Sequence, residues 1–277
     1  MRLIDTHSHI YEPEFDADRD EVVARAREAG VGRLLFPAID GASHGRMLEA
    51  CRRYGDYCLP MMGLHPTSVN DNPRWREELE EVAALLKSPP AGIRFVGVGE
   101  IGLDLYWSAA FRDEQIEAFR RQCRLALEYD LPIAVHTRSA WAEMEQVVGE
   151  FRGCGLRGVF HAFGEDEATY CRLRALGDFR FGIGGVVTFK KSPLAETVRS
   201  MALEDLVLET DCPYLTPVPF RGKRNESGYI VYICERVAEL KGLTPEEVAR
   251  TTSRTVEELF SLAPAEDTND KTERDNE

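Results

Sequence analysis

The sequence predicts a single-domain α/β fold, a (β/α)8 barrel of the TIM type. Eight short apolar segments follow one another along the chain, and amphipathic stretches of helical length separate them. The total length of 277 residues is also close to the roughly 250 residues that are common for a single barrel. Because strands and helices alternate, we expect neighbouring strands to run parallel and to be joined by right-handed crossovers.

The predicted strands are short, rich in branched apolar residues and apolar on both faces, as expected for a sheet that helices cover. They comprise residues 2–5, 33–39, 57–63, 94–99, 132–136, 157–161, 179–184 and 206–210. An open doubly wound sheet is the alternative arrangement. Eight strands in a chain of this length favour the closed barrel.

The predicted helices are amphipathic and end close to Gly, Asp or Pro, which are typical helix stop signals. They comprise residues 19–30, 44–55, 75–88, 112–130, 140–154, 166–177, 193–202, 229–242 and 244–261. The last helix begins with Thr244, whose hydroxyl is suited to cap the free N–H groups of a first turn.

The domain organisation follows from composition. We expect residues 1–262 to form the barrel and residues 263–277 to form an acidic, disordered tail, because PAEDTNDKTERDNE carries six acidic and two basic residues and lacks apolar periodicity.

The formal net charge of the whole chain is −14. Taken alone, this charge argues against nonspecific binding of nucleic acid.

The compartment is predicted from absences. The first residues, MRLID, show no basic region followed by a long apolar run, and no apolar run approaches the length of a membrane span, so we expect neither a signal peptide nor a transmembrane helix. The seven cysteines are odd in number and form no C-x-x-C pair. This pattern argues against a disulfide framework or a cysteine zinc site and favours a reducing, cytoplasmic location.

Most of the histidines stand at the C-terminal ends of predicted strands. In the segment IDTHSHI, the two imidazoles are two residues apart and therefore point the same way from an extended backbone. In a barrel these strand ends share one rim, where active sites form. His44 opens a helix, and we expect it on the surface. The residues expected at the rim are His7, His9, His65, His136 and His161, joined by Glu100 and Asp211.

Imidazole and carboxylate groups that converge on one rim form a ligand set for a divalent cation such as Zn²⁺, Mn²⁺, Ni²⁺ or Mg²⁺. Four histidines and two acids exceed the needs of one tetrahedral ion, so we expect two ions. Glu100 is the natural bridge between them. We assign His7, His9, Glu100 and Asp211 to one ion, and Glu100, His136 and His161 to the other.

Eight segments in order resemble one protein family: DTHSHI, GLHPTSV, VGEIGLDLYW, IAVHTR, FHAF, GIGGVVTFKK, LVLETDCPYLTP and PFRGKRNESGY. The chain is similar to the TatD-type metal-dependent hydrolases, usually described as TatD family deoxyribonucleases. The resemblance implies a barrel of the metallo-dependent hydrolase type, divalent metals at the positions above, and hydrolysis of phosphodiester bonds in DNA, often as an exonuclease. The chain departs from the family pattern at Phe220, Ala162 and Ser227, where His, Cys and Pro are common. None of these is a predicted metal ligand.

The chemistry of phosphodiester hydrolysis gives the acids their expected roles. Asp211 would accept the proton of the attacking water, and Glu100 would join it in catalysis as the bridging ligand. Asp104 and Glu209 would orient the metal ligands from behind through hydrogen bonds.

Substrate contacts are expected from His65, Arg138 and Arg221. For the two arginines we expect phosphate contact, because a guanidinium matches phosphate oxygens in bidentate fashion. Three aromatic residues near the rim could either stack on bases or only pack. The further basic residues are Lys190, Lys191, Lys223 and Arg224, and the aromatic residues are Tyr106, Trp107 and Phe189.

We expect the substrate to be DNA, held at its ends or as short single strands, and we infer neither a membrane nor a protein partner. One alternative is an amidohydrolase or esterase on the same barrel, such as a D-aminoacyl-tRNA deacylase. Many amidohydrolases bridge their metals with a carboxylated lysine, and here Glu100 takes that place. A second alternative is a metal-stabilised interaction scaffold without enzymatic activity. A complete set of ligands argues against it, because a structural metal needs no open position.

Overall fold

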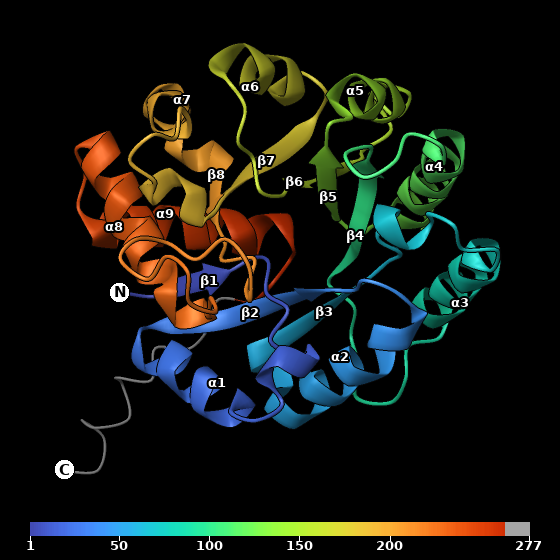
Figure 1. Cartoon of the computed structure of the whole chain (residues 1–277), viewed down its shortest axis with the longest axis horizontal. Coiled ribbons are helices and arrows are strands. Elements are labelled where there is room, and N and C mark those ends of the chain that lie inside the picture. Colours follow the sequence, from blue (N-terminus) through green and yellow to red (C-terminus); the bar gives the residue numbers. More distant parts are fainter. Residues whose placement is uncertain (264–277) are drawn as a thin grey trace.

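A computed structural model describes residues 1–263, which form a barrel of eight parallel strands ringed by helices (Figure 1). The strand order follows the chain order from β1 to β8, so each strand pairs with the next one in sequence. The strands are β1 (Leu3–Asp5), β2 (Val31–Pro37), β3 (Cys58–Met62), β4 (Gly97–Asp104), β5 (Ile133–Arg138), β6 (Arg157–Phe160), β7 (Asp178–Ile183) and β8 (Leu206–Leu208).

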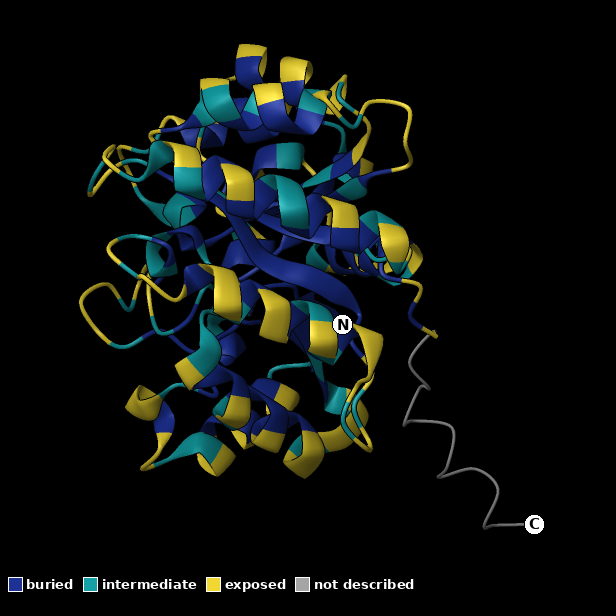
Figure 2. Cartoon of the chain, turned by 90° about the vertical axis from the view of Figure 1, so that its right-hand side faces the viewer, coloured by how far each residue is buried: buried dark blue, intermediate teal, exposed yellow. Residues whose placement is uncertain are grey.

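Seven of the α-helices connect consecutive strands and pack around the outside of the sheet, and two more follow the last strand; their exposed faces are turned to solvent (Figure 2). The α-helices are α1 (Arg19–Glu28), α2 (Gly41–Tyr54), α3 (Trp75–Lys87), α4 (Arg112–Glu128), α5 (Trp141–Gly149), α6 (Glu167–Arg174), α7 (Leu194–Ser200), α8 (Ile230–Lys241) and α9 (Pro245–Leu259). Short 3₁₀ helices are η1 (Pro13–Phe15), η2 (Gly55–Tyr57), η3 (Pro66–Ser68), η4 (Gly185–Thr188), η5 (Leu203–Asp205) and η6 (Ser227–Tyr229).

The barrel closes between β8 and β1 through main-chain hydrogen bonds. Thr6 N donates to Leu208 O at 3.1 Å. One step further along, Asp211 N donates to His7 O at 2.9 Å. An open doubly wound sheet has free edges at its outer strands, so these bonds confirm the closed barrel that the sequence predicts.

Strand β4 is the largest departure from the predicted strand boundaries. The sequence places it at residues 94–99, whereas the structure places it at Gly97–Asp104. Glycines interrupt the apolar pattern of this segment, and its pairing with β5 shifts register between Val98 and Ile101. As a result, Glu100 and Asp104 lie within the strand rather than beyond its end.

The strands have two apolar faces, and each face belongs to a different core. Outward side chains such as Leu3, Leu34 and Val135 pack with the surrounding helices. Inward side chains near the N-terminal mouth form a second core with the last helix, α9, and the residues that follow it. This inner core comprises Ile4, Leu35, Met61, Val96, Ala134, Val159 and Val207 from the barrel, and Val256, Leu259, Phe260 and Leu262 from the C-terminal segment.

Helix α9 begins as the sequence predicts. The Thr244 side chain accepts a hydrogen bond from Glu247 N, and the Glu247 side chain accepts one from Thr244 N, which completes a capping box. Pro245 occupies the first turn, where its missing N–H costs no hydrogen bond. The cap fixes where α9 starts and so helps to place the helix under the barrel.

Three further expectations concern the whole chain. The predicted acidic tail lies outside the described residues from position 264 onward. Within residues 1–263, no helix is both long enough and apolar enough to span a membrane. All seven cysteines are free thiols, in agreement with the absence of a predicted disulfide framework.

Candidate metal centre and active site

The C-terminal mouth of the barrel contains a cavity of about 660 Å³. Side chains from β4 and β5 and from the segments after β1, β2, β3, β6 and β8 converge on it, although they are spread over two hundred positions of the chain. Ten of the residues that line the cavity are His9, His65, Glu100, Asp104, Trp107, His136, Arg138, His161, Asp211 and Tyr214.

Strand geometry delivers these side chains to the barrel interior. Alternate residues of a strand share one face, so a residue two positions after an inward apolar side chain also points inward, one layer closer to the C-terminal mouth. The inner core therefore gives way to polar groups along the same strands. This step runs from Ala134 to His136 in β5, from Val159 to His161 after β6, and from Val207 to Glu209 after β8.

Glu100 lies at the centre of the site, 3% exposed. Its two carboxylate oxygens face opposite groups of histidines. Oε2 lies 3.1 Å from His7 Nε2, whereas Oε1 lies 2.9 Å from His136 Nδ1. The register shift in β4 positions this residue, and Glu100 N is anchored to Ala38 O at 3.0 Å. One carboxylate thus joins two halves of the site.

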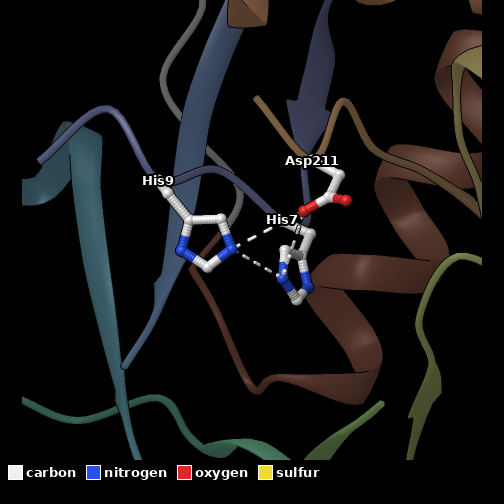
Figure 3. Close-up of side chains that lie close together, drawn as sticks. All are labelled: His7, His9 and Asp211. Atoms are coloured by element: carbon white, nitrogen blue, oxygen red, sulfur yellow. Dashed lines mark hydrogen bonds and ion pairs between the residues drawn. The ribbon is translucent and has the colours of Figure 1, made fainter. Parts of the chain in front are cut away.

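The first half contains His7, His9 and Asp211, which point toward one another (Figure 3). The Nε2 atoms of His7 and His9 are 3.1 Å apart. Asp211 Oδ1 lies 3.6 Å from His9 Nε2 and 3.8 Å from His7 Nε2. Three ligand atoms at these separations can share one cation.

The second half contains His136 and His161 on the other side of Glu100. His161 Nε2 lies 3.8 Å from Glu100 Oε1 and 3.9 Å from Asp211 Oδ1. The rings of His161 and His7 stack with centroids 3.5 Å apart, so the two halves are in direct contact. The structure therefore brings together all six side chains that the sequence assigns to metals.

Tyr11 orients His9, a role that the sequence analysis missed. The phenol donates its proton to Pro37 O at 2.5 Å, so its oxygen accepts from His9 Nδ1 at 2.9 Å. The proton of the neutral His9 ring is therefore on Nδ1, and the lone pair on Nε2 faces the site, as a metal ligand requires. The signal in the sequence was the spacing, because Tyr11 follows His9 by two residues.

Asp104 and Glu209 stand behind two of the histidines, where the sequence analysis expects them. Asp104 Oδ2 lies 3.0 Å from His136 Nε2, and Glu209 Oε1 lies 3.0 Å from His161 Nδ1. Glu209 fits only because residue 182 is glycine, since a Cβ atom there would overlap Glu209 Oε2. Both carboxylates can thus fix the ring that faces the site.

His65 is grouped by distance with Glu100 and His136, and its Nε2 lies 3.5 Å from Glu100 Oε1. Its hydrogen bonds give it a different character from the other histidines. Thr67 N donates to His65 Nδ1 at 3.2 Å, so that nitrogen carries no proton. Burial lowers the pKa of His65, and the neutral ring then carries its proton on Nε2. His65 therefore presents a hydrogen-bond donor to the cavity.

The buried carboxylates of the site raise the pKa of two neighbouring histidines and so favour their positively charged forms. Burial opposes protonation of His161, but the charges of Glu209 and two further carboxylates outweigh it and raise its pKa to about 10. Burial also opposes protonation of His136, yet its contacts with Asp104 and Glu100 raise its pKa to about 8. The neighbouring histidines keep the pKa of Glu100 well below its usual range, although burial acts in the opposite direction. A divalent cation supplies the same positive charge, so these residues fit one.

The arginines of the rim differ in whether they line the cavity and in what holds their side chains. Arg138 is exposed, lines the cavity, and has no ion-pair partner within residues 1–263. Arg221 lies over the Phe189 ring at 3.7 Å from its centroid and is not among the residues that line the cavity. Arg224 is held by Asp18, with its Nη2 2.6 Å from Oδ2. Arg138 is therefore the arginine best placed to meet a substrate in the cavity.

The expectation that His44 is a surface residue is wrong. His44 is 5% exposed, and its Nε2 lies 3.2 Å from Gly63 O. The carbonyl can only accept, so Nε2 carries a proton and donates it, and burial lowers the pKa of the ring, which favours its neutral form. His44 belongs to the packing of α2 against the segment after β3, and it does not reach the metal centre.

Comparison with known proteins adds independent information. The family described as TatD related DNase matches residues 4–261. A Bacillus subtilis protein named uncharacterized metal-dependent hydrolase YabD is 37% identical over 262 residues, which is 94% of this chain and 99% of that protein. An Erwinia amylovora protein named 3'-5' ssDNA/RNA exonuclease TatD is 30% identical over 268 residues, covering 94% of this chain and all of the relative.

Among solved structures, the TatD homologue YjjV from Escherichia coli K12 superposes with a TM-score of 0.86 at 29% identity. The match covers 95% of this chain and 99% of YjjV. The similarity therefore extends over the whole barrel and is not restricted to the metal-binding segments.

Proposed function

The chain belongs to the family of TatD-related DNases and is a metal-dependent hydrolase, and from this premise we propose that it hydrolyses phosphodiester bonds of DNA, at ends or in short single strands. The observation that carries the proposal is the position of Glu100, whose two oxygens face two groups of histidines. A site of this kind suits two divalent ions, and phosphoryl transfer is chemistry for which paired ions are well suited.

His7, His9 and Asp211 would hold one ion, His136 and His161 would hold the other, and Glu100 would contact both. When bound, the pair of ions would lower the pKa of the attacking water and neutralise the charge on the phosphoryl oxygens and the leaving group. Mg²⁺, Mn²⁺, Zn²⁺ and Ni²⁺ are all compatible with nitrogen and oxygen ligands.

Asp211 is the proposed proton acceptor. Burial opposes its charge, but the charge of His161 and the contact with His9 lower the pKa of Asp211, so it is ionised at neutral pH. Its position is fixed by the main-chain bond from Asp211 N to His7 O at 2.9 Å. At 15% side-chain exposure it is more open to the cavity than Glu100, at 5%. A water that enters from the cavity therefore meets this carboxylate.

His65 and Arg138 are the proposed phosphate contacts. His65 offers an N–H from Nε2, and the Arg138 guanidinium is free of carboxylate partners among residues 1–263. Hydrogen bonds to phosphate from an N–H donor and from a guanidinium are of the strong, charge-assisted kind. Arg221 remains a proposed contact for a longer substrate, outside the cavity.

The net charge of −14 is compatible with a nucleic acid substrate if binding is local. Repulsion from an acidic body disfavours contact along a long duplex, whereas a strand end can enter a cavity that would hold two cations and is lined by Arg138, which has no carboxylate partner among residues 1–263. The family name and the name of the Erwinia amylovora relative support a nucleic acid substrate. That relative's name also includes RNA, so RNA belongs among the substrates to be tested.

The test is a degradation assay with resolved product lengths. Protein stripped with EDTA would be reloaded with each of the four metals and offered end-labelled single-stranded DNA, duplex DNA and RNA. We expect metal-dependent cleavage of single strands, and loss of cleavage in Glu100→Gln. A panel of amides and acyl esters is run in parallel. Turnover of that panel with intact nucleic acids would contradict the proposal and favour an amidohydrolase or deacylase.

A further inference from the structure

We propose that Tyr106, Trp107 and Arg138 form a platform on which an unpaired nucleobase of the substrate stacks, next to the metal centre. This inference rests on the proposed phosphodiesterase function and adds a subsite for the base. The three residues come from β5 and from the segment after β4, and they are called the base platform below.

The exposure of the two aromatic rings is unusual for this chain. Trp107 is 69% exposed and is the most exposed large hydrophobic side chain among the described residues, and Tyr106 is 55% exposed. Single exposed aromatic residues need no explanation, but a cluster of them marks a binding surface. Tyr214 and Leu215, also exposed, line the same cavity. Exposed apolar surface therefore gathers at the mouth that contains the metal centre.

The platform is continuous with that centre. Trp107 and Arg138 line the cavity together with Glu100, His136 and Asp211. A nucleotide whose phosphate reaches the metals can therefore place its base against this wall. The negative phosphate and Arg138, which has no ion-pair partner in the described part of the chain, are also complementary in charge.

The geometry of the platform is fixed before any substrate arrives. The Arg138 guanidinium carbon lies over the Tyr106 ring, 3.6 Å from its centroid, and 5.5 Å from the centroid of Trp107. The Tyr106 and Trp107 rings meet edge to face with centroids 5.0 Å apart. Tyr106 N donates to Asp104 Oδ1 at 3.0 Å, and Asp104 also contacts His136. One carboxylate thus ties the platform to a proposed metal ligand.

The chemistry of the occupant follows from these contacts. Aromatic rings and guanidinium groups both stack on nucleobases, and this interaction is tolerant of sequence because every base has a π face. In a duplex the faces of a base are covered by its neighbours, so only an unpaired base can lie on the platform. The platform therefore favours single strands and frayed ends over an intact duplex.

The first test compares oligothymidylate with an oligomer of the same length built from tetrahydrofuran abasic residues, which keeps the phosphodiester backbone and lacks bases. We expect the wild-type KM to be about ten-fold higher for the abasic oligomer, since stacking on one base is commonly worth about that factor. Trp107→Ala should raise the KM for oligothymidylate by a similar factor and leave the KM for the abasic oligomer unchanged. Trp107→Phe, which keeps a ring, should restore most of the affinity.

Leu243→Ala is the matched control, because it removes an exposed apolar side chain from the linker between α8 and α9. It should change neither KM. Equal KM values for the two oligomers, in the wild type and in Trp107→Ala, would overturn the platform while phosphodiester hydrolysis stands. Cleavage of neither oligomer with any metal would instead overturn the proposed function.

A second test of the base platform measures ligand binding by fluorescence and requires no turnover. The chain has three tryptophans; Trp75 is buried and Trp141 is half-buried, so Trp107 dominates any quenching by a ligand in the cavity. We expect thymidine 5′-monophosphate to quench the fluorescence in a saturable manner, and deoxyribose 5-phosphate to leave it unchanged. In Trp107→Phe the quenching should vanish. Equal quenching by both ligands, or by neither, would refute a base site at this wall.

Discussion

The two mouths of the barrel are built from the same strands but have opposite properties. At the N-terminal mouth, inward apolar side chains of the barrel pack against α9 and the residues after it, which close the opening. At the C-terminal mouth the inward side chains of the same strands are histidines and acids around an open cavity. A step of two residues along a strand thus separates packing from chemistry.

The backbone differs between the mouths as well. Of the seven non-glycine residues with positive φ among residues 1–263, four follow strands at the C-terminal mouth. A left-handed backbone at such residues is strained. These four residues are Ser139, Ala162, Asp211 and Leu215. The apolar packing at the N-terminal mouth therefore stabilises the fold and offsets the backbone strain and the buried charges at the C-terminal mouth.

The largest expected effect comes from removing one charge at the C-terminal mouth. Asp211→Asn keeps the size of the side chain but removes the proposed proton acceptor, so we expect kcat to fall about 10³-fold, as for the loss of a general base. Steady-state kinetics, with metal content measured on the same samples, would test this. A fall of less than about ten-fold with both ions retained would exclude this role.

The matched change at the other end is Asp205→Asn. Asp205 is 7% exposed and is held by Tyr170, whose hydroxyl donates to Oδ2 at 2.5 Å, and by Arg174, with Nε 2.6 Å away. We expect it to lower the free energy of unfolding by about 1–3 kcal/mol and to leave the kcat of the folded enzyme unchanged. Equal losses of kcat in the two variants would break the division between the mouths.

The second largest effect is expected on the free energy of unfolding, when a side chain of the inner core is removed. Phe260 is 2% exposed and packs with α9 against the inward side chains of the barrel. Phe260→Ala should lower the free energy of unfolding by about 3–5 kcal/mol, measured by urea denaturation, with kcat per folded molecule unchanged. Trp107→Ala removes an even larger side chain from the open mouth, yet it should cost less than about 0.5 kcal/mol. Similar costs for the two would contradict the comparison.

A third variant tests the support behind the metal ligands. Gly182→Ala places a Cβ atom where Glu209 lies, so Glu209 has to move away from His161. We expect divalent metal affinity to fall about 10–100-fold, as when the partner of a ligand is lost, measured by calorimetric titration. Gly45→Ala is the control, since a Cβ atom there meets no atom within 4 Å. Gly45→Ala should leave metal affinity unchanged. Unchanged affinity in Gly182→Ala, or an equal loss in both variants, would exclude the role given to Glu209.

Much of this arrangement can be predicted from the sequence, because it depends on period and order. Alternating strands and helices fix the barrel, and the histidines after β1, near the end of β5 and after β6 fall on one rim because parallel strands all end there. The Thr244 cap could also be predicted, since its partner Glu247 is three residues away. These features depend on residues that are close in sequence or on topology alone.

The remaining features depend on contacts between distant residues. The sequence assigns Glu100 to the end of a strand, but the glycines of β4 and its register shift extend the strand beyond it. The pairing of Tyr11 with Pro37 O lies outside any local pattern, as does the proximity of Gly182 to Glu209. The sequence therefore predicts most of the residues that form the site, but the orientation of their side chains can only be seen in the structure.

The smallest expected effect concerns His44, which lies outside both mouths and is buried for packing. Burial lowers the pKa of His44, although Gly63 O and the charges of Asp40, Glu78 and Glu81 act against it. Its pKa is thus below the value near 6.5 expected in the unfolded chain. Between the two values the unfolded state binds the extra proton, so acid favours unfolding.

We therefore expect His44 to contribute stability that is present above about pH 6.5 and is lost as the pH falls below it. His44→Gln can still donate a hydrogen bond to Gly63 O but does not titrate. The difference in unfolding free energy between wild type and this variant should shift by about 1 kcal/mol against the wild type between about pH 7.5 and 5.5, measured by urea denaturation in EDTA. Histidines of the metal centre titrate in both proteins and cancel in this difference. A difference that is independent of pH would show that folding leaves the pKa of His44 unchanged, and a difference that shifts in favour of the wild type as the pH falls would show that folding holds the ring protonated. Either outcome would contradict a neutral donor held by burial.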